Sequence, residues 1–332
     1  MTKDQLKIVF LGTPEFAVES LDALVKDGCN IVGVVTMPDK VAGRGHKLLQ
    51  SPVKQYALEH NLPVLQPVNL KDPEFIRELE ALGADLFIVI AFRMLPKAVW
   101  QMPRLGTFNL HASLLPRYRG AAPINRAVMN GDKVTGVTTF FLKHEIDTGD
   151  IIAQESLQIA DDEDVGSVHD RLMHLGAQMV LKTVHDILAT DGNVPVKPQP
   201  EGEFLPAPKI FTEDCRIDWT QPVETVRNQV RGLSPYPAAF TEIEAADGRI
   251  LKLKVFAGKR ADELTNQHIT EDGTTTPLNP GDLIVTPKRL AVMCADAPYE
   301  ILSLQLQGKK RMDTAAFLLG FHPRRILNPS GE

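Results

Sequence analysis

Two polar residues, Asn109 and His111, stand two positions apart at the end of a short strand-like run, T-F-N-L-H at residues 107–111. Side chains at positions i and i+2 of a strand point to the same face, so we expect these two to converge while Leu110 turns into the packing. A carboxylate, Asp147, follows 36 residues after His111 in the turn-forming sequence D-T-G-D. We expect this turn to return Asp147 to the same edge.

An amide, an imidazole and a carboxylate around one point suit acyl transfer without a metal or a covalent nucleophile. Transfer of a formyl group to an amine passes through a tetrahedral oxyanion, and each preorganised donor aimed at that oxygen commonly contributes ~2.7–4 kcal/mol. Asn109 can donate from its amide, and His111 can donate when protonated, a form that a nearby Asp147 favours. Asp147 can also accept the proton of the nucleophile, directly or through water. Either motif alone is common turn chemistry, so the inference depends on their order and spacing.

The first 160 residues contain the elements that must position this set, because apolar runs alternate there with helical patterns. The main strand-like runs are residues 7–12, 31–36, 85–91 and 107–111. Continuous apolar strands that alternate with helices predict a mostly parallel sheet covered on both faces. In such sheets ligands bind beyond the carboxyl ends of the strands, which is where Asn109 and His111 fall.

A change of composition near residue 190 predicts a second domain. Five prolines and two glycines fall within residues 192–208, as in a semi-rigid linker. Beyond it, one helical pattern and several short strand-like runs predict a small β-barrel or sandwich. We therefore expect a catalytic domain at 1–190, a linker at 191–208 and a further domain at 209–332.

The bulk composition excludes several classes of protein. A length of 332 residues favours two domains, and 43% hydrophobic with 23% charged residues is ordinary for a globular chain. A net charge of −6 disfavours nucleic-acid binding over the whole surface but allows a local basic patch. Three cysteines without a C-x-x-C pair disfavour a disulfide framework or a four-sulfur zinc site and predict a cytoplasmic protein. No apolar stretch approaches the ~20 residues that span a bilayer, so no membrane association is expected.

Other catalytic motifs are incomplete. The sequence after the first strand, G-T-P-E-F at residues 12–16, lacks the second and third glycines of a dinucleotide-binding loop, so a nicotinamide oxidoreductase is disfavoured. No phosphate-binding G-x-x-x-x-G-K-[ST] motif is present. His169 and His174 are five residues apart and off a common helical face, so no metal site is expected.

The N-x-H and D-T-G motifs occur together with several other ordered segments. These are F-L-G-T-P-E-F-A at residues 10–17, A-G-R-G at 42–45, S-P-V-K at 51–54, P-R-Y-R-G-A-A-P at 116–123, I-D-W at 217–219 and Q-G-K-K at 307–310. Together they resemble the folate-dependent formyltransferase family over nearly the whole chain. The resemblance implies a Rossmann-like catalytic domain, a linker and a C-terminal OB-like β-barrel domain that binds tRNA. It also implies 10-formyltetrahydrofolate as donor and methionyl initiator tRNA as acceptor, with no obligatory protein partner.

The resemblance also assigns residues. It gives catalytic roles to Asn109, His111 and Asp147, and it makes the S-L-L-P element folate-contacting, namely Ser113, Leu114, Leu115 and Pro116. In one place the chain departs from the family pattern. The segment A-F-R-M-L-P at residues 91–96 is one residue shorter than the usual A-Y-G-x-x-L-P and places Arg93 near the glycine position. The resemblance implies that this segment borders the folate pocket.

Two basic segments are candidates for tRNA contact. Residues 40–54 carry four basic side chains and no acid, and the resemblance makes this the loop that enters the acceptor stem, with Arg44 and Lys47 as contacts. Lys309 and Lys310 belong to a second basic patch, where phosphate contacts would add affinity without reading sequence. For Phe317 and Phe321 the helical spacing favours core packing over base stacking.

Two alternatives remain open at this stage. The first keeps the chemistry and changes the acceptor, as in a formyltransferase acting on a nucleotide sugar or purine precursor, or in a formylfolate hydrolase. The second is a non-enzymatic RNA-binding protein built on the barrel and its basic patches. Oligomeric state, tRNA base preference and the group that takes the amine proton are not encoded in any recognisable pattern.

Overall fold

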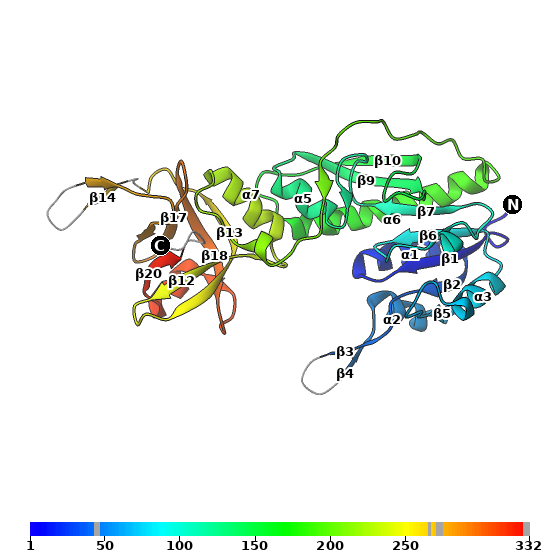
Figure 1. Ribbon diagram of the computed structural model, residues 1–332, viewed down its shortest axis with the longest axis horizontal. Coiled ribbons are helices and arrows are strands. Elements are labelled where there is room, and N and C mark those ends of the chain that lie inside the picture. The colour runs from blue at the N-terminus through cyan, green and yellow to red at the C-terminus, as the bar shows by residue number, and fades with distance from the viewer. Residues whose placement is uncertain (43–46, 265–266, 270–274, 328–332) are drawn as a thin grey trace. The chain divides into compact units, whose positions relative to one another are not determined.

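The computed structural model describes residues 1–42, 47–264, 267–269 and 275–327, which fold into two compact units. The first comprises Met1–Pro123, Val134–Gln158 and His169–Pro208. The second comprises Ile124–Lys133, Ile159–Val168 and the described residues from Lys209 onward. Figure 1 labels their elements.

The first unit contains most of the helices and eleven of the described strands. Its strands are β1 (Lys7–Gly12), β2 (Asn30–Val35), β3 (Lys40–Ala42), β4 (Lys47–Leu49), β5 (Val64–Leu65), β6 (Leu86–Ile90), β7 (Thr107–His111), β8 (Arg119–Gly120), β9 (Val134–Phe141), β10 (Ile151–Gln158) and β11 (Pro206–Ala207). Its helices are α1 (Glu15–Lys26), α2 (Pro52–Glu59), α3 (Pro73–Ala81), α4 (Lys97–Trp100) and most of α6 (Val165–Ala189).

A seven-stranded sheet of order β10-β9-β7-β6-β1-β2-β5 forms the centre of this unit. The pairs β1–β2, β1–β6, β2–β5 and β6–β7 are parallel, whereas β9 is antiparallel to both β7 and β10. The predicted mostly parallel sheet is therefore confirmed. The chain leaves β1 toward β2 on one side and reaches β6 on the other, so the carboxyl ends of β1 and β6 mark the crevice where such sheets bind ligands.

Helices cover both faces of the sheet, which explains why its strands are apolar on both sides. Phe87 and Val89 of β6 pack in one cluster with Leu79 of α3 and Val99 of α4. On the other face, α6 approaches so closely that a Cβ added at Gly176 would lie 2.7 Å from Leu110 Cδ2. Leu110 is 3% exposed and turns into this packing, as its position in the strand predicts.

The proline-rich segment after α6 runs back along the first unit (Figure 1). Backbone hydrogen bonds fix it there at several points. Lys197 and Ile151 exchange two backbone hydrogen bonds, both 2.8 Å long. Farther on, β11 pairs in parallel with β8. We call residues 195–207 the return segment.

The second unit contains the remaining elements. They are α5 (Pro123–Met129), the 3-10 helix η1 (Glu213–Cys215), α7 (Val223–Leu233), α8 (Thr314–Gly320), β12 (Ala239–Ala245), β13 (Ile250–Arg260), β14 (Gln267–Ile269), β15 (Thr275–Pro277), β16 (Leu283–Val285), β17 (Leu290–Met293), β18 (Pro298–Leu306), β19 (Met312–Asp313) and β20 (Pro323–Leu327).

Its main sheet has the order β16-β17-β18-β13-β12-β20, with β19 paired to β18, and all its pairs are antiparallel. The two outer strands, β16 and β20, lie next to each other, so the sheet nearly closes on itself. Trp219, Tyr299 and Val230 of α7 are buried in its core. The predicted OB-like barrel is confirmed. Phe317 is 3% exposed and stacks on Phe321 at 4.8 Å between ring centroids, so its predicted core role is confirmed as well.

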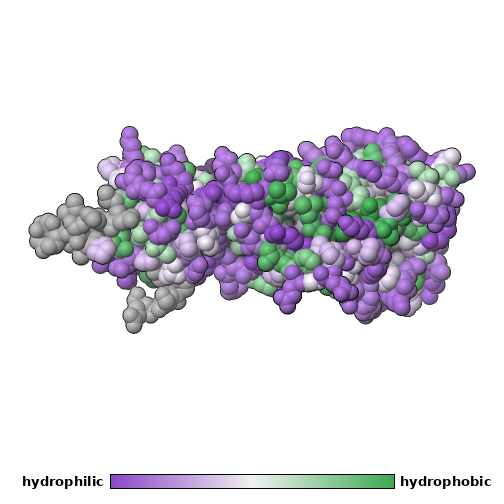
Figure 2. Space-filling model, turned by 90° about the horizontal axis from the view of Figure 1, so that it is seen from above, coloured by the Kyte–Doolittle hydropathy of each residue, from purple (hydrophilic) through white to green (hydrophobic). Residues whose placement is uncertain are grey.

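The surface in Figure 2 is mostly hydrophilic, with hydrophobic residues gathered in scattered patches. Across the described ranges, none of the helices combines the length with the apolarity that a bilayer-spanning segment requires.

Candidate active site

Asn109 and His111 lie at the carboxyl end of β7, on the face of the sheet opposite Leu110. Asn109 is registered with Val89 of β6 and Phe140 of β9, and His111 with Thr138 of β9. Asn109 is half-buried, and among the described residues none is hydrogen-bonded to its side chain. Its amide is therefore available to a ligand at this edge.

The His111 side chain is buried and has a defined orientation. Its Nε2 lies 2.8 Å from the Tyr118 carbonyl oxygen, which can only accept, so Nε2 carries the hydrogen. Its Nδ1 lies 3.8 Å from Asp147 Oδ2. That distance is longer than a hydrogen bond, so Nδ1 and the carboxylate face the same small volume without bonding to each other. The nitrogen free for chemistry is thus Nδ1, a detail that the spacing of the motif alone does not contain.

Asp147 lies in the turn between β9 and β10. Its φ of 55° is left-handed, a region that Asp tolerates better than most residues. Its Oδ2 accepts a 2.9 Å hydrogen bond from the Gly120 amide. Two residues on, a Cβ added at Gly149 would lie 1.6 Å from the Phe141 carbonyl oxygen, so only glycine fits there. The glycine of the D-T-G sequence therefore lets this turn pack against the end of β9.

The S-L-L-P element is anchored mainly through its backbone. Thr138 Oγ1 donates to the Ser113 carbonyl at 2.6 Å and accepts from the Leu115 amide at 3.2 Å. Ser113 Oγ donates to the Arg117 carbonyl at 2.7 Å. Ser113 and Leu115 are buried, whereas Leu114 and Pro116 keep part of their side chains exposed. A ligand at this edge would therefore meet Leu114, Pro116 and the backbone.

Arg93 is used in contacts within the protein. Its guanidinium donates to the Pro67 carbonyl at 2.7 Å and the Val68 carbonyl at 3.0 Å, and it lies 5.4 Å from the Phe92 ring centroid. Burial lowers its pKa from the ordinary arginine value. Arg93 thus joins the segment after β6 to the segment after β5, both at the carboxyl edge of the sheet.

The candidate tRNA-binding residues are only partly visible. Arg44 lies outside the described residues, and so does the side chain of Lys47 at the start of β4. Lys54 forms a 2.6 Å ion pair with Asp39 and is engaged within the fold. Lys309 and Lys310 are exposed.

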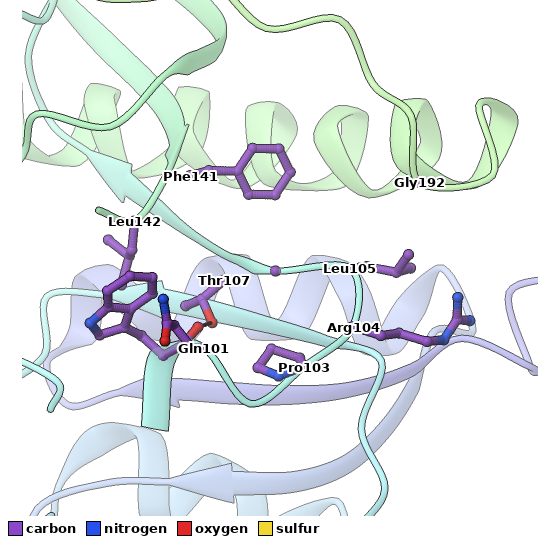
Figure 3. Close-up of a pocket in the computed structure, with 10 residues that line it drawn as sticks. Gln101, Pro103, Arg104, Leu105, Thr107, Phe141, Leu142 and Gly192 are labelled. Atoms are coloured by element: carbon purple, nitrogen blue, oxygen red, sulfur yellow. Dashed lines mark hydrogen bonds between the residues drawn. The ribbon is translucent and has the colours of Figure 1, made fainter. Parts of the chain in front are cut away.

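A groove of about 430 Å³ lies at the opposite end of β7 (Figure 3). Thr107, Phe141 and Leu142 line it, and Thr107 begins the strand that His111 ends. It is therefore separate from the candidate active site. Within the described ranges, no cluster of three or more His, Cys, Asp or Glu side chains is arranged to hold a metal ion.

Comparison with protein families assigns this fold and site to a known class. The formyl transferase model matches residues 6–184, and the formyl transferase C-terminal domain model matches residues 209–322. The chain belongs to the formyl transferase family.

Its close relatives carry a more particular name. It is 57% identical over 327 residues to the methionyl-tRNA formyltransferase of Bacteroides fragilis, covering 97% of each chain. It is 47% identical over 318 residues to that of Flavobacterium johnsoniae, covering 96% of each.

Solved structures share the fold at lower identity. The N-formyltransferase from Helicobacter canadensis, in complex with folinic acid and dTDP-3-aminofucose, is 16% identical with a TM-score of 0.61, and the match covers 93% of this chain and 100% of that one. HypX from Aquifex aeolicus, in complex with tetrahydrofolic acid, is 20% identical with a TM-score of 0.58, covering 94% of this chain and 46% of that one.

Proposed function

We propose that this protein transfers the formyl group of 10-formyltetrahydrofolate to the amino group of methionyl initiator tRNA, and so supports translation initiation. The identity of 57% over 97% of both chains to a methionyl-tRNA formyltransferase carries the choice of acceptor. The juxtaposition of His111 and Asp147, with Nδ1 3.8 Å from Oδ2, supports the chemistry.

The reaction joins the amine nitrogen to the formyl carbon. As that bond forms, the carbonyl oxygen becomes an oxyanion, which the Asn109 amide and a protonated His111 Nδ1 stabilise. Collapse of the tetrahedral state re-forms the carbonyl and breaks the bond between carbon and N10 of the folate. N10 takes up a proton and the amine nitrogen loses one, which Asp147 accepts directly or through water.

The half-buried Asn109 amide, without a partner among the described residues, fits a polar group of the formyl donor. Ser113, Leu114, Leu115 and Pro116 form the adjacent wall of the folate site in this proposal. Because Ser113 and Leu115 are buried, their part is to shape the backbone, and Leu114 and Pro116 make the contacts.

The tRNA is bound through basic side chains of both units. Arg44 and Lys47 reach the acceptor stem, and Lys309 with Lys310 contact phosphates. The functional boundaries are 1–190 for catalysis, 191–208 for the linker and 209–332 for tRNA binding. The protein works in the cytoplasm without an obligatory protein partner.

Formyl transfer should be assayed with three acceptors in parallel, namely charged initiator tRNA, a nucleotide-linked amino sugar and water. We expect turnover with the tRNA to exceed the others by orders of magnitude. Faster transfer to the sugar, or hydrolysis alone, would refute the proposed acceptor while keeping the chemistry. Folate binding without any transfer would refute the enzymatic role.

A further inference from the structure

Gln199 in the return segment contacts the turn that carries Asp147. Its Nε2 donates to the Asp147 carbonyl at 2.8 Å and to the Gly149 carbonyl at 2.9 Å. Its Oε1 accepts from Arg119 at 2.6 Å through Nη2 and at 3.1 Å through Nε. Both ends of one amide are therefore used, and they join the D-T-G turn to β8.

These contacts hold Asp147 from its backbone side. Its carboxylate is held from the other side, because Gly120, the neighbour of Arg119, donates its amide to Oδ2 at 2.9 Å. Asp147 has a left-handed φ of 55°, and such a conformation persists where surrounding contacts hold it. Gln199 therefore fixes the Asp147 carbonyl and the Gly149 carbonyl of this turn.

The return segment also supports His111. Tyr118 donates its amide to the Leu205 carbonyl at 2.6 Å, and the Tyr118 carbonyl accepts from His111 Nε2. Earlier in the segment, the Lys197–Ile151 pairing ties it to β10. One stretch of chain after α6 thus reaches the supports of both members of the His111–Asp147 pair.

We infer that Gln199 is a positioning residue for formyl transfer, which keeps the Asp147 carboxylate in register with His111 Nδ1. This inference rests on the proposed function. Gln199 acts through Asp147 and does not itself meet the reacting atoms. A carboxylate displaced by about 1 Å can cost on the order of 100-fold in rate, so the loss of two hydrogen bonds to its turn should be visible in turnover.

The test compares substitutions that keep opposite halves of the contact. Gln199→Lys keeps a donor for the two carbonyls and loses the acceptor for Arg119. Gln199→Glu keeps the acceptor and replaces the donor by a second oxygen. Gln199→Ala removes both, and Glu201→Ala, an exposed side chain on the same segment, is the matched control.

We expect kcat to fall roughly 10- to 100-fold for Gln199→Ala and Gln199→Glu, with KM for the formyl donor within about twofold. Gln199→Lys should retain several-fold more turnover than either, and Glu201→Ala should match the unsubstituted protein. Melting temperatures of all variants should agree within a few degrees, as for surface substitutions.

Three results would overturn the inference, namely unchanged kcat in Gln199→Ala, a KM effect in place of a kcat effect, or more turnover in the glutamate variant than in the lysine variant. The last would show that the bond to Arg119 is the one that matters. If the unsubstituted protein transfers no formyl group, the proposed function fails by itself, whatever the variants do.

Discussion

The edge of β7 and the basic surface of the barrel differ in how firmly their charged side chains are held. At the β7 edge, His111 and Asp147 have side chains 8% and 15% exposed and are held by backbone groups of Tyr118 and Gly120. On the barrel, Lys309 and Lys310 are exposed, and the described residues offer them no ion-pair partner. The difference fits the roles proposed for the two regions. Catalysis needs fixed atoms, whereas attraction of a polyanion needs only accessible charge.

The same contrast exists within the barrel. Arg324 lies 3.0 Å from Glu244 Oε1 and Arg325 lies 2.5 Å from Oε2, so one carboxylate engages both. Lys309 and Lys310 therefore differ from Arg324 and Arg325, whose charges Glu244 engages. The distance from each basic side chain to an acid decides whether it is free to contact a phosphate. A count of charges along the chain does not give that distance.

Removal of the fixed groups at the β7 edge should have the largest effect. We expect Asn109→Ala and Asp147→Ala each to lower kcat by about 10²–10³-fold, because each removes a group aimed at the reacting centre. The free energy of unfolding should change by less than about 2 kcal/mol. Turnover and thermal unfolding should be measured together, with the exposed neighbour Ile146→Ala as the control. Normal turnover in either folded variant would remove that residue from the mechanism.

A second substitution tests whether Arg93 orders the carboxyl edge of the sheet for binding of the formyl donor. Arg93→Met should raise KM for the formyl donor by about 3- to 10-fold and change kcat less, because the segments it joins lose two hydrogen bonds and must be ordered on binding. Steady-state kinetics at saturating tRNA would measure this, with exposed Lys97→Ala alongside. An unchanged KM would show that Arg93 serves only the fold.

Arg44 is the proposed contact with the acceptor stem of the tRNA. Arg44→Ala should raise KM for the tRNA by several-fold and leave that for the formyl donor unchanged, as expected for a contact worth ~1 kcal/mol or more. Varying each substrate in turn gives both constants from one preparation. Identical tRNA kinetics would reject this contact.

A smaller effect is expected on the barrel. Lys309→Ala and Lys310→Ala should each lower the slope of log affinity for tRNA against log salt by about 1. Arg325→Ala removes a base that Glu244 already engages, and Glu244 keeps its pair with Arg324, so this variant should keep the slope. Equal slopes in all of these proteins would show that the patch does not meet the tRNA.

The smallest effect concerns stability in acid. Arg289 donates to Glu300 and holds the pKa of that carboxyl below the ordinary 4.5. Because folding depresses the pKa of Glu300, its ionised carboxylate stabilises the folded state at pH values above the ordinary pKa of 4.5. This contribution is lost as the pH falls below that value. Between pH 6 and pH 3.5, Glu300→Gln should therefore show a shallower decline of melting temperature than the unsubstituted protein. A parallel decline would mean that this pair contributes nothing measurable.

Much of the fold follows from local pattern. The run at residues 7–12 became β1, and that at residues 107–111 became β7, because continuous apolar residues between turn signals suit a strand buried on both faces. The positions of Asn109 and His111 on one face follow from the period of a strand alone. Their meeting with Asp147 was an expectation from turn residues, and Gly149 supplies the steric reason.

Other features were missed because they depend on contacts between distant parts of the chain. A proline-rich stretch reads as a linker, and nothing in its composition indicates that Gln199 bonds to a turn 52 residues earlier. Nor does the sequence tell which nitrogen of His111 is engaged, since Tyr118 takes Nε2 only once its own loop is folded.

By itself, the sequence determined the alternation of strands and helices, the edge at which the polar residues end, and the family, because these depend on residue order and periodicity. The tertiary structure decided which charges are free, which nitrogen faces Asp147 and which segment holds its turn. These are matters of distance between atoms remote in the chain, and periodicity carries no information about such distances.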